Sequence, residues 1–94
     1  MISFTPGAEA DLQAIFDYIA PDDLAAAGRI VARILQAIQM LENFPQIGRP
    51  GRVAGTRELH IVGLHYFAVY RAIGADDLEV VAVVHDRQRF PPEQ

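Results

Sequence analysis

Residues 78–85 read Leu-Glu-Val-Val-Ala-Val-Val-His, a run whose one acidic side chain is Glu79. The β-branched valines favour extended backbone, and the length of the run is usual for a strand. Because nearly all of its side chains are apolar, such a strand must be covered on both of its faces. The sequence therefore predicts a central strand over residues 78–85, and the rest of the fold is built outward from it.

Two stretches with a period close to two precede this strand, at residues 57–62 and 65–73. The segments that separate the three stretches are Gly63-Leu64 and Gly74-Ala75-Asp76-Asp77. Connections this short join antiparallel strands, so we predict three strands in an antiparallel sheet. Residues 46–56 contain three Gly, one Pro and two Arg, and this composition predicts a surface loop before the first of the three strands.

The first half of the chain has helical periodicity. Met1 to Phe4 reads as a short strand, after which Thr5 suits a helix N-cap and Pro6 suits the first helical position. An apolar stripe at helical spacing follows, made of Ala8, Leu12, Ile15, Phe16 and Ile19. We predict a first helix that ends at the Ala20-Pro21-Asp22-Asp23 segment.

A second, longer helix is predicted from about Leu24 to Asn43. Its apolar positions again repeat at three and four residues: Ala27, Ile30, Val31, Ile34, Leu35, Ile38 and Leu41. Asn43-Phe44-Pro45 ends the helix, because the residue before a proline avoids helical backbone. Two helices joined by so short a segment are expected to be nearly antiparallel neighbours in a helical hairpin.

These elements give the order β-α-α-β-β-β. The apolar stripes of the hairpin must be buried, and one face of the sheet is the available partner. We therefore predict an α+β fold with an N-terminal strand and a helical hairpin packed on an antiparallel sheet. A chain of 94 residues suits one domain, which we assign to residues 1–94.

The composition excludes several classes of protein. Hydrophobic residues make up 51% of the chain, too many for a disordered protein, and the absence of cysteine excludes disulfide frameworks and cysteine-based metal sites. We find no apolar run near the ~18 residues that a membrane span needs, and the first residues do not resemble a signal peptide. The expectation is a soluble cytoplasmic protein with no membrane partner.

The charge distribution is uneven. All eight basic residues are Arg, and residues 1–47 carry two of them against six acids, so the whole net charge of −4 lies in the first half. A protein that grips nucleic acid through counterion release normally has a basic surplus, so any nucleic-acid contact here must be local. Arginine without lysine favours planar contacts at an interface.

Common catalytic and metal-binding patterns are missing. The sequence has no phosphate-binding glycine loop, no His-Glu-x-x-His and no Gly-x-Ser-x-Gly, and its one serine is Ser3. The carboxylates form no obvious acid–base pair. His60, His65 and His85 are the candidate metal ligands, but they lack a supporting spacing motif, so we predict no metal and no cofactor.

Arginine, histidine and aromatic residues are crowded into the second half of the chain. Tyr66 and Tyr70 share a strand face, and we expect them to pack on the sheet. Arg87, Arg89 and Phe90 lie just past the last strand, where loops often carry contact residues. An arginine–aromatic cluster suits a protein-binding hot spot, and it also suits an RNA site with stacked bases.

Seven stretches of the chain, taken together, resemble the RelE/ParE toxins of bacterial type II toxin–antitoxin modules. The matching pieces are Phe4-Thr5-Pro6 with Ala10-Asp11-Leu12 and Tyr18-Ile19-Ala20, Phe44 to Arg49, Gly55 to Leu59, Tyr66 to Arg71, and Val84 to Arg89. They run nearly end to end in the family's order and spacing. The fold of that family, β-α-α-β-β-β, agrees with the one that the periods predict.

The resemblance implies a small toxin that a cognate antitoxin binds and neutralises. RelE-like members cut mRNA on the ribosome, whereas ParE-like members inhibit DNA gyrase. The Gly-Thr-Arg-Glu-Leu and Val-His-x-Arg-x-Arg pieces resemble the ParE branch. Nuclease members commonly have a basic residue where this chain has Phe67, and they often have a Tyr or His near the C-terminal end, where the tail of this chain offers Phe90. They also carry several lysines, whereas this chain has none.

The leading hypothesis is therefore a ParE-like gyrase inhibitor that is not itself an enzyme. Its expected target contacts are Arg87, Arg89 and Phe90, supported by Arg57 and Arg71, for which a structural role is the alternative. The second hypothesis is a RelE-like, ribosome-dependent mRNA endonuclease that uses His85 and Arg87. A third is a degenerate toxin that only binds its antitoxin.

Overall fold

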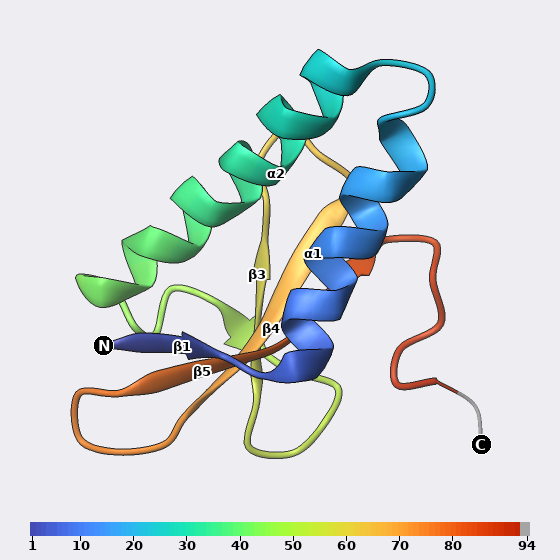
Figure 1. Cartoon of the computed structure of the whole chain (residues 1–94). Coiled ribbons are helices and arrows are strands. Elements are labelled where there is room, and N and C mark those ends of the chain that lie inside the picture. Colours follow the sequence, from blue (N-terminus) through green and yellow to red (C-terminus); the bar gives the residue numbers. More distant parts are fainter. Residues whose placement is uncertain (93–94) are drawn as a thin grey trace.

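The computed structural model describes residues 1–92 of the chain. Figure 1 shows two helices lying over a twisted sheet. In chain order the elements are β1 (Ile2–Phe4), α1 (Pro6–Ile19), α2 (Leu24–Gln39), the short 3₁₀ helix η1 (Met40–Glu42), β2 (Arg49–Pro50), β3 (Arg57–His60), β4 (Tyr66–Ala72) and β5 (Leu78–His85). The α+β fold and the order of the predicted elements are confirmed.

The five strands form one sheet in the order β1-β5-β4-β3-β2. β5 lies between β1 and β4, as expected for the apolar run at residues 78–85. β1 pairs with β5 in parallel, and the other neighbouring pairs are antiparallel. The last two strands are a hairpin, so the sheet positions the chain that follows β5 next to the start of β4.

β2 corrects the prediction of a loop without strands between residues 46 and 56. Arg49 pairs with Glu58, and Pro50 pairs with Arg57, at the edge of the sheet. A strand of two residues has no measurable period, and a proline argues against a strand in a sequence pattern. Proline is nevertheless tolerated here because the outer side of an edge strand needs no hydrogen-bond donor.

Thr5 joins the start of α1 to a bulge in β5. Its side-chain oxygen accepts a hydrogen bond from the backbone N–H of Ala8 (3.0 Å), which confirms the predicted N-cap, and its hydroxyl donates to the carbonyl of Val81 (3.2 Å). Val81 is the extra residue of the bulge, since Val80 pairs with Tyr70 and the next paired residue is Ala82.

The second helix is shorter than predicted. Asp23 caps its start by accepting from the N–H of Ala26 (3.0 Å), but the α-helix ends at Gln39 and not at Asn43. The 3₁₀ turn of η1 continues it as far as Glu42. Helices often tighten in this way at their C-terminal end, and the apolar spacing in the sequence does not distinguish the two helix types.

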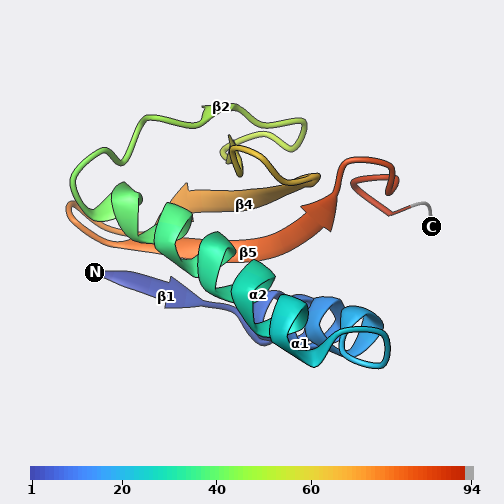
Figure 2. The ribbon, with the colours of Figure 1, turned by 90° about the horizontal axis from the view of Figure 1, so that it is seen from above.

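Both helices cover one face of the sheet (Figure 2). They meet at the turn between Ile19 and Leu24 and diverge toward their other ends, so they are neighbours but not closely antiparallel (Figure 1). The main core lies between helices and sheet and contains Ala8, Ile15, Ile34, Ile38, Leu41, Ile61, Ala68, Tyr70, Leu78, Val80 and Val83. Tyr66 packs against this core from the same face of β4 as Tyr70, as the sequence predicts.

The segment from Leu24 to Glu42 corrects the statement that no apolar run approaches the length of a membrane span. It is 19 residues long with a mean hydropathy of 1.3, which by length and composition alone is enough to cross a membrane. The core helix of a soluble protein has the same composition. In this fold Ile34, Ile38 and Leu41 pack against the sheet, which explains part of this apolar character, whereas Leu24, Leu35 and Met40 of the same segment are exposed.

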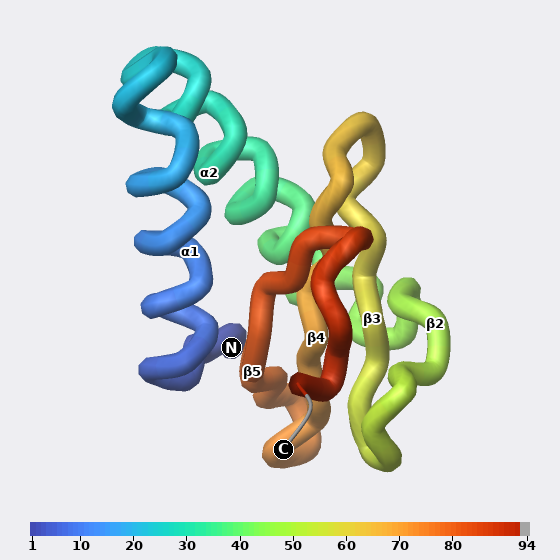
Figure 3. The backbone as a smooth tube through the Cα atoms, turned by 90° about the vertical axis from the view of Figure 1, so that its right-hand side faces the viewer, coloured from blue at the N-terminus to red at the C-terminus, as the bar shows by residue number. Residues whose placement is uncertain are grey.

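A second, smaller apolar cluster lies on the opposite face of the sheet. Phe67, Val69 and Val84 form its buried part, and Phe90 packs against them. Figure 3 shows how this contact arises, because the chain turns after β5 and runs back alongside the sheet, on the side away from the helices. The tail that sequence reasoning left without a position is therefore placed on this second face as far as residue 92.

Candidate target-binding surface

The segment after β5 leaves the sheet through a turn organised by His85. The backbone N–H of Gln88 donates to the carbonyl of His85 (2.8 Å), and the N–H of Arg87 donates to its ring nitrogen Nδ1 (3.1 Å). The backbone N–H of His85 in turn donates to the side-chain oxygen of Gln88 (3.3 Å). These three bonds fix the direction in which the chain leaves β5 and hold Arg87 at the turn.

A cleft of about 480 Å³ lies between α1 and the end of β5. Ile15 and Tyr18 line it from α1, Tyr66 and His85 from the sheet, and Arg87 from the turn. Tyr18 is 82% exposed. The cleft thus places aromatic rings beside a cation, a combination enriched where one protein binds another.

Tyr66 and His85 form the floor of this cleft on the sheet side. Their rings are 5.1 Å apart and meet edge to face at 89°. Burial raises the pKa of Tyr66, and the nearby Tyr18 adds to the rise. Tyr66 therefore keeps its proton at neutral pH, and the cleft offers a hydroxyl and not a phenolate to a ligand.

Asp11 closes the cleft along the outer edge of β5. β1 covers this edge only from Leu78 to Val80, so the following backbone groups have no neighbouring strand on that side. The carboxylate of Asp11 accepts a hydrogen bond from the N–H of Val83 (2.9 Å). A helix side chain thereby substitutes for a strand, and α1 is fixed against the sheet at the cleft.

Arg87, Arg89 and Phe90 are brought together in one segment, but their side chains have different environments. The Arg87 side chain is exposed and has no hydrogen bond or ion pair within residues 1–92. Arg89 is also exposed. Phe90 is half-buried and meets the ring of Phe67 edge to face, with centroids 6.2 Å apart. Phe90 thus anchors the segment, and Arg87 points to solvent.

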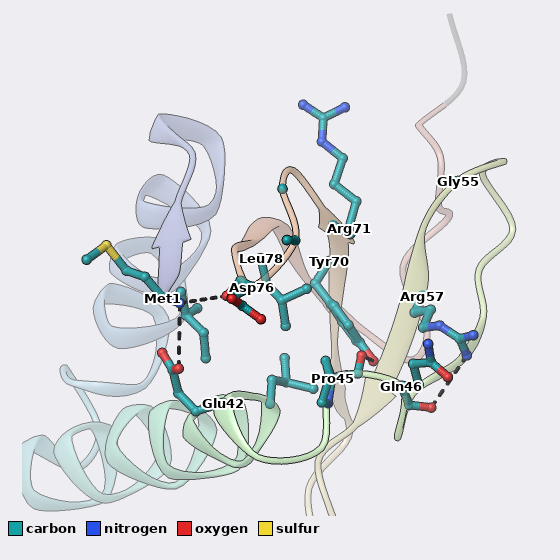
Figure 4. Close-up of a pocket in the computed structure, with 15 residues that line it drawn as sticks. Met1, Glu42, Pro45, Gln46, Gly55, Arg57, Tyr70, Arg71, Asp76 and Leu78 are labelled. Atoms are coloured by element: carbon teal, nitrogen blue, oxygen red, sulfur yellow. Dashed lines mark hydrogen bonds and ion pairs between the residues drawn. The ribbon is translucent and has the colours of Figure 1, made fainter.

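Arg57 and Arg71 are not part of this surface. They border a separate hollow of about 520 Å³ beside Tyr70 and the N-terminus (Figure 4). The guanidinium of Arg57 donates to the carbonyl of Gly48 (2.8 Å), and that of Arg71 is bound to Glu79 on the next strand (2.9 Å). Both groups already have protein partners, which favours the structural alternative for these two residues.

Glu58 is a buried charge that sequence reasoning did not single out. Its side chain is 1% exposed, and it accepts hydrogen bonds from Arg49 (3.1 Å) and from the backbone N–H of Arg52 (2.9 Å). The Nε atom of Arg52 is 3.6 Å away. The sequence contains a signal for this network, because Glu58 is the one acid between Glu42 and Asp76 and closely follows two arginines, Arg49 and Arg52.

The three histidines do not form a metal site. His60 and His65 both lie near the carboxylate of Asp86, at 3.7 and 3.6 Å, and the ring of His85 is tilted by 35° relative to that of His65, with centroids 6.1 Å apart. Within the part of the chain that the structure describes, no group of three or more His, Asp or Glu side chains is arranged to hold a metal ion.

Comparison with known proteins identifies the family. The sequence profile of the ParE toxin of the type II toxin–antitoxin system parDE matches residues 2–90. The chain belongs to the ParE toxin family. A relative from Sinorhizobium fredii strain NGR234, named "Putative toxin Y4kP", is 41% identical over 90 residues, which cover 96% of this chain and 92% of the relative.

A solved structure has the same fold as this ParE-family chain. It is titled "Chromosomal ParDE TA system from P. aeruginosa", and one of its chains superposes with a TM-score of 0.80 at 24% sequence identity. The match covers 89% of this chain and 92% of that chain. The resemblance to RelE/ParE toxins that the sequence motifs predict is thus confirmed for the ParE branch, and the chain is a ParE-family toxin of a type II toxin–antitoxin system.

Proposed function

We propose that this ParE-family toxin inhibits DNA gyrase by binding it, without catalysing a reaction itself. The observation that carries the proposal is the position of Arg87. Arg49, Arg52 and Arg71 are paired with acids, whereas the Arg87 guanidinium is exposed at the rim of an aromatic cleft and is not engaged by residues 1–92. A cation beside exposed aromatic rings is suited to a protein partner.

The environments of two phenylalanines support a non-catalytic role. Phe67 stands where nuclease relatives commonly carry a basic residue, and it is buried under Arg52 and Phe90. Near the C-terminal end, where those relatives often carry a proton-transfer group, this chain has Phe90, which packs inward. Neither side chain can exchange a proton, and acid–base catalysis typically contributes about 10²–10⁴-fold to a rate.

A supercoiling assay with purified gyrase tests the proposal. Gyrase and relaxed plasmid are incubated with increasing amounts of the toxin, and we expect supercoiling to fail at a stoichiometric excess. The matched control is the Arg87→Ala variant, which removes one exposed guanidinium. Normal supercoiling at high excess of the folded wild-type toxin rejects gyrase as the target.

The same preparation is tested for the alternative, ribosome-dependent mRNA cleavage. In that mechanism His85 and Arg87 are the reacting groups. The Nδ1 atom of His85 accepts the N–H of Arg87, so only Nε2 is available to move a proton. Cleaved mRNA in a translating extract, lost in His85→Ala, replaces the gyrase proposal with this one. Neither activity, and no growth arrest on expression, points to a degenerate toxin that only binds its antitoxin.

We also propose that a cognate antitoxin covers the exposed apolar side chains of the toxin in the cytoplasm. Large apolar residues that are exposed include Tyr18, Leu24 and Leu35 on or beside the helices. A partner segment with apolar residues at helical spacing and with Asp or Glu for Arg87 complements this surface. Co-expression with the neighbouring gene product is expected to raise soluble yield and to restore growth, whereas equal yield and growth with and without it contradict the proposal.

A further inference from the structure

The ring of Phe67 is the point where the C-terminal segment meets the rest of the molecule. Phe67 is 1% exposed, and it lies on the face of the sheet that the helices do not cover. The ring of Phe90 approaches it edge to face, at 81° between the planes. The guanidinium carbon of Arg52 lies 4.9 Å from the centre of the same ring. Arg52 and Phe90, which come from different loops, therefore both contact the ring of Phe67.

Glu58 determines where Arg52 lies. The backbone N–H of Arg52 donates to Oε2 of Glu58, and its Nε is near Oε1 of the same carboxylate. Glu58 is on β3 and its side chain is almost fully buried, so the packing of the sheet holds this carboxylate in place. The loop is thus held so that the Arg52 guanidinium covers Phe67.

We infer that Arg52 is a positioning residue for the target-binding segment. Held by Glu58, it completes the packing around Phe67 on which Phe90 docks, and the docked Phe90 fixes the direction of the chain between the His85 turn and residue 90. Arg52 acts through Phe67 and Phe90, without contact to the target. The inference rests on the proposed function, because it takes the segment with Arg87 to be the part that binds.

Arg49 supplies a matched control. It donates to the same carboxylate of Glu58 at 3.1 Å, but within residues 1–92 it makes no cation–π contact. Arg49→Ala and Arg52→Ala each remove one cation from Glu58 and change the net charge equally. If Arg49 and Arg52 only stabilise the fold, the two changes have similar effects. If Arg52 is a positioning residue, only Arg52→Ala releases the tail, that is, the segment from Asp86 to Phe90, from Phe67.

The first measurement is amide hydrogen exchange in the full-length toxin. The N–H of Gln88 is bonded to the carbonyl of His85 and reports whether the turn stays formed. We expect Arg52→Ala to speed exchange of the Gln88 N–H about tenfold, because a cation–π contact is lost, and Arg49→Ala to leave it within about twofold. Arg52→Lys keeps a cation near the ring and is expected to restore much of the protection.

The second measurement uses a fluorescent reporter. The chain contains no tryptophan, so Phe90→Trp places a single indole at the contact with Phe67. Adding Arg52→Ala to this variant is expected to shift the emission to longer wavelength and to increase quenching by acrylamide. Adding Arg49→Ala is expected to change neither. The reporter keeps the test valid if exchange is dominated by global unfolding.

Gyrase inhibition then links the position of the tail to activity. We expect Arg52→Ala, but not Arg49→Ala, to raise the toxin concentration needed for half-inhibition about tenfold. A tail that stays protected in Arg52→Ala overturns the inference, and so does a released tail with unchanged inhibition. If the wild-type toxin does not inhibit gyrase, the proposed function fails, and exchange and fluorescence alone decide whether Arg52 positions the tail.

Discussion

The phenolic oxygen of Tyr70 lies 2.9 Å from the carbonyl oxygen of Pro45, to which it donates a hydrogen bond. The same oxygen accepts the N–H of Gly48, also at 2.9 Å. One buried hydroxyl on β4 therefore satisfies two backbone groups of the connection between η1 and β2. This connection leads into β2, which starts with Arg49, and then into the loop with Arg52, so Tyr70 fixes the chain just before β2 on the sheet.

Tyr70→Phe is expected to lower the free energy of unfolding by about 1–3 kcal/mol, because the N–H of Gly48 and the carbonyl of Pro45 lose their partner in a buried place. Urea denaturation followed by circular dichroism measures the change. Tyr18→Phe is the control, since Tyr18 is largely exposed, and it is expected to leave stability within about 0.5 kcal/mol. Equal effects of the two changes contradict this account of Tyr70.

Asp11→Ala is expected to destabilise the fold by about 1–3 kcal/mol, because the N–H of Val83 then has no acceptor at the outer edge of β5. Asp17→Ala is a control on the same helix that removes an equal charge. Among the described residues, the Asp17 carboxylate is bonded to the exposed side chain of Gln13 alone, so its loss is expected to have little effect. Thermal unfolding of both variants measures the difference. An unchanged melting temperature in Asp11→Ala would show that the hydrogen bond from Val83 to Asp11 does not stabilise the fold.

Tyr66 is expected to contribute to a fall in the free energy of unfolding at alkaline pH. Its pKa is raised above the ordinary 10.0 by burial, so the folded state holds the phenolic proton more tightly than the unfolded chain does. The resulting stability is complete below the unfolded pKa and is lost as the pH rises through the folded one. Tyr66→Phe is expected to flatten the decline of unfolding free energy above about pH 10, and parallel declines for wild type and variant contradict the assignment.

Arg87→Ala is expected to weaken gyrase inhibition about 5- to 30-fold, the usual effect of losing a hot-spot side chain, without changing stability. The Arg87 side chain is exposed and makes no bond in the fold of residues 1–92, so there is little stability to lose. Arg29→Ala is a charge-matched control on the exposed side of α2. Titration of supercoiling activity measures both, and equal weakening by the two changes indicates a general charge effect.

The regular elements were predictable because each has a local cause. Thr5 and Pro6 mark the start of α1 through capping and fixed backbone geometry, and the valines of residues 78–85 favour an interior strand. β2 was not predictable, because its two residues lack a period and owe their conformation to pairing with β3. The end of α2 was placed too late for a similar reason, since apolar spacing continues through the 3₁₀ turn.

The candidate site was predictable only as a set of residue types. The sequence predicts a cluster of arginines with aromatic residues, but a formal charge does not reveal its partner. Arg57 finds backbone carbonyls and Arg71 finds Glu79, each through strand pairings set by the whole sheet. The return of the tail, which turns Phe90 inward and leaves Arg87 outside, depends on a nonlocal contact with Phe67.

The side chains that satisfy the outer edge of β5 also guard against self-association. Beyond β1, the N–H groups of Val83 and His85 are taken by Asp11 and Gln88, so a second copy finds no row of vacant donors on which to add a strand. Substitution of Asp11 or Gln88 would leave an unpaired N–H group on this edge of a folded molecule, where a strand of another copy could pair. Polymerisation, and not only unfolding, is then a route by which such a toxin would lose its potency.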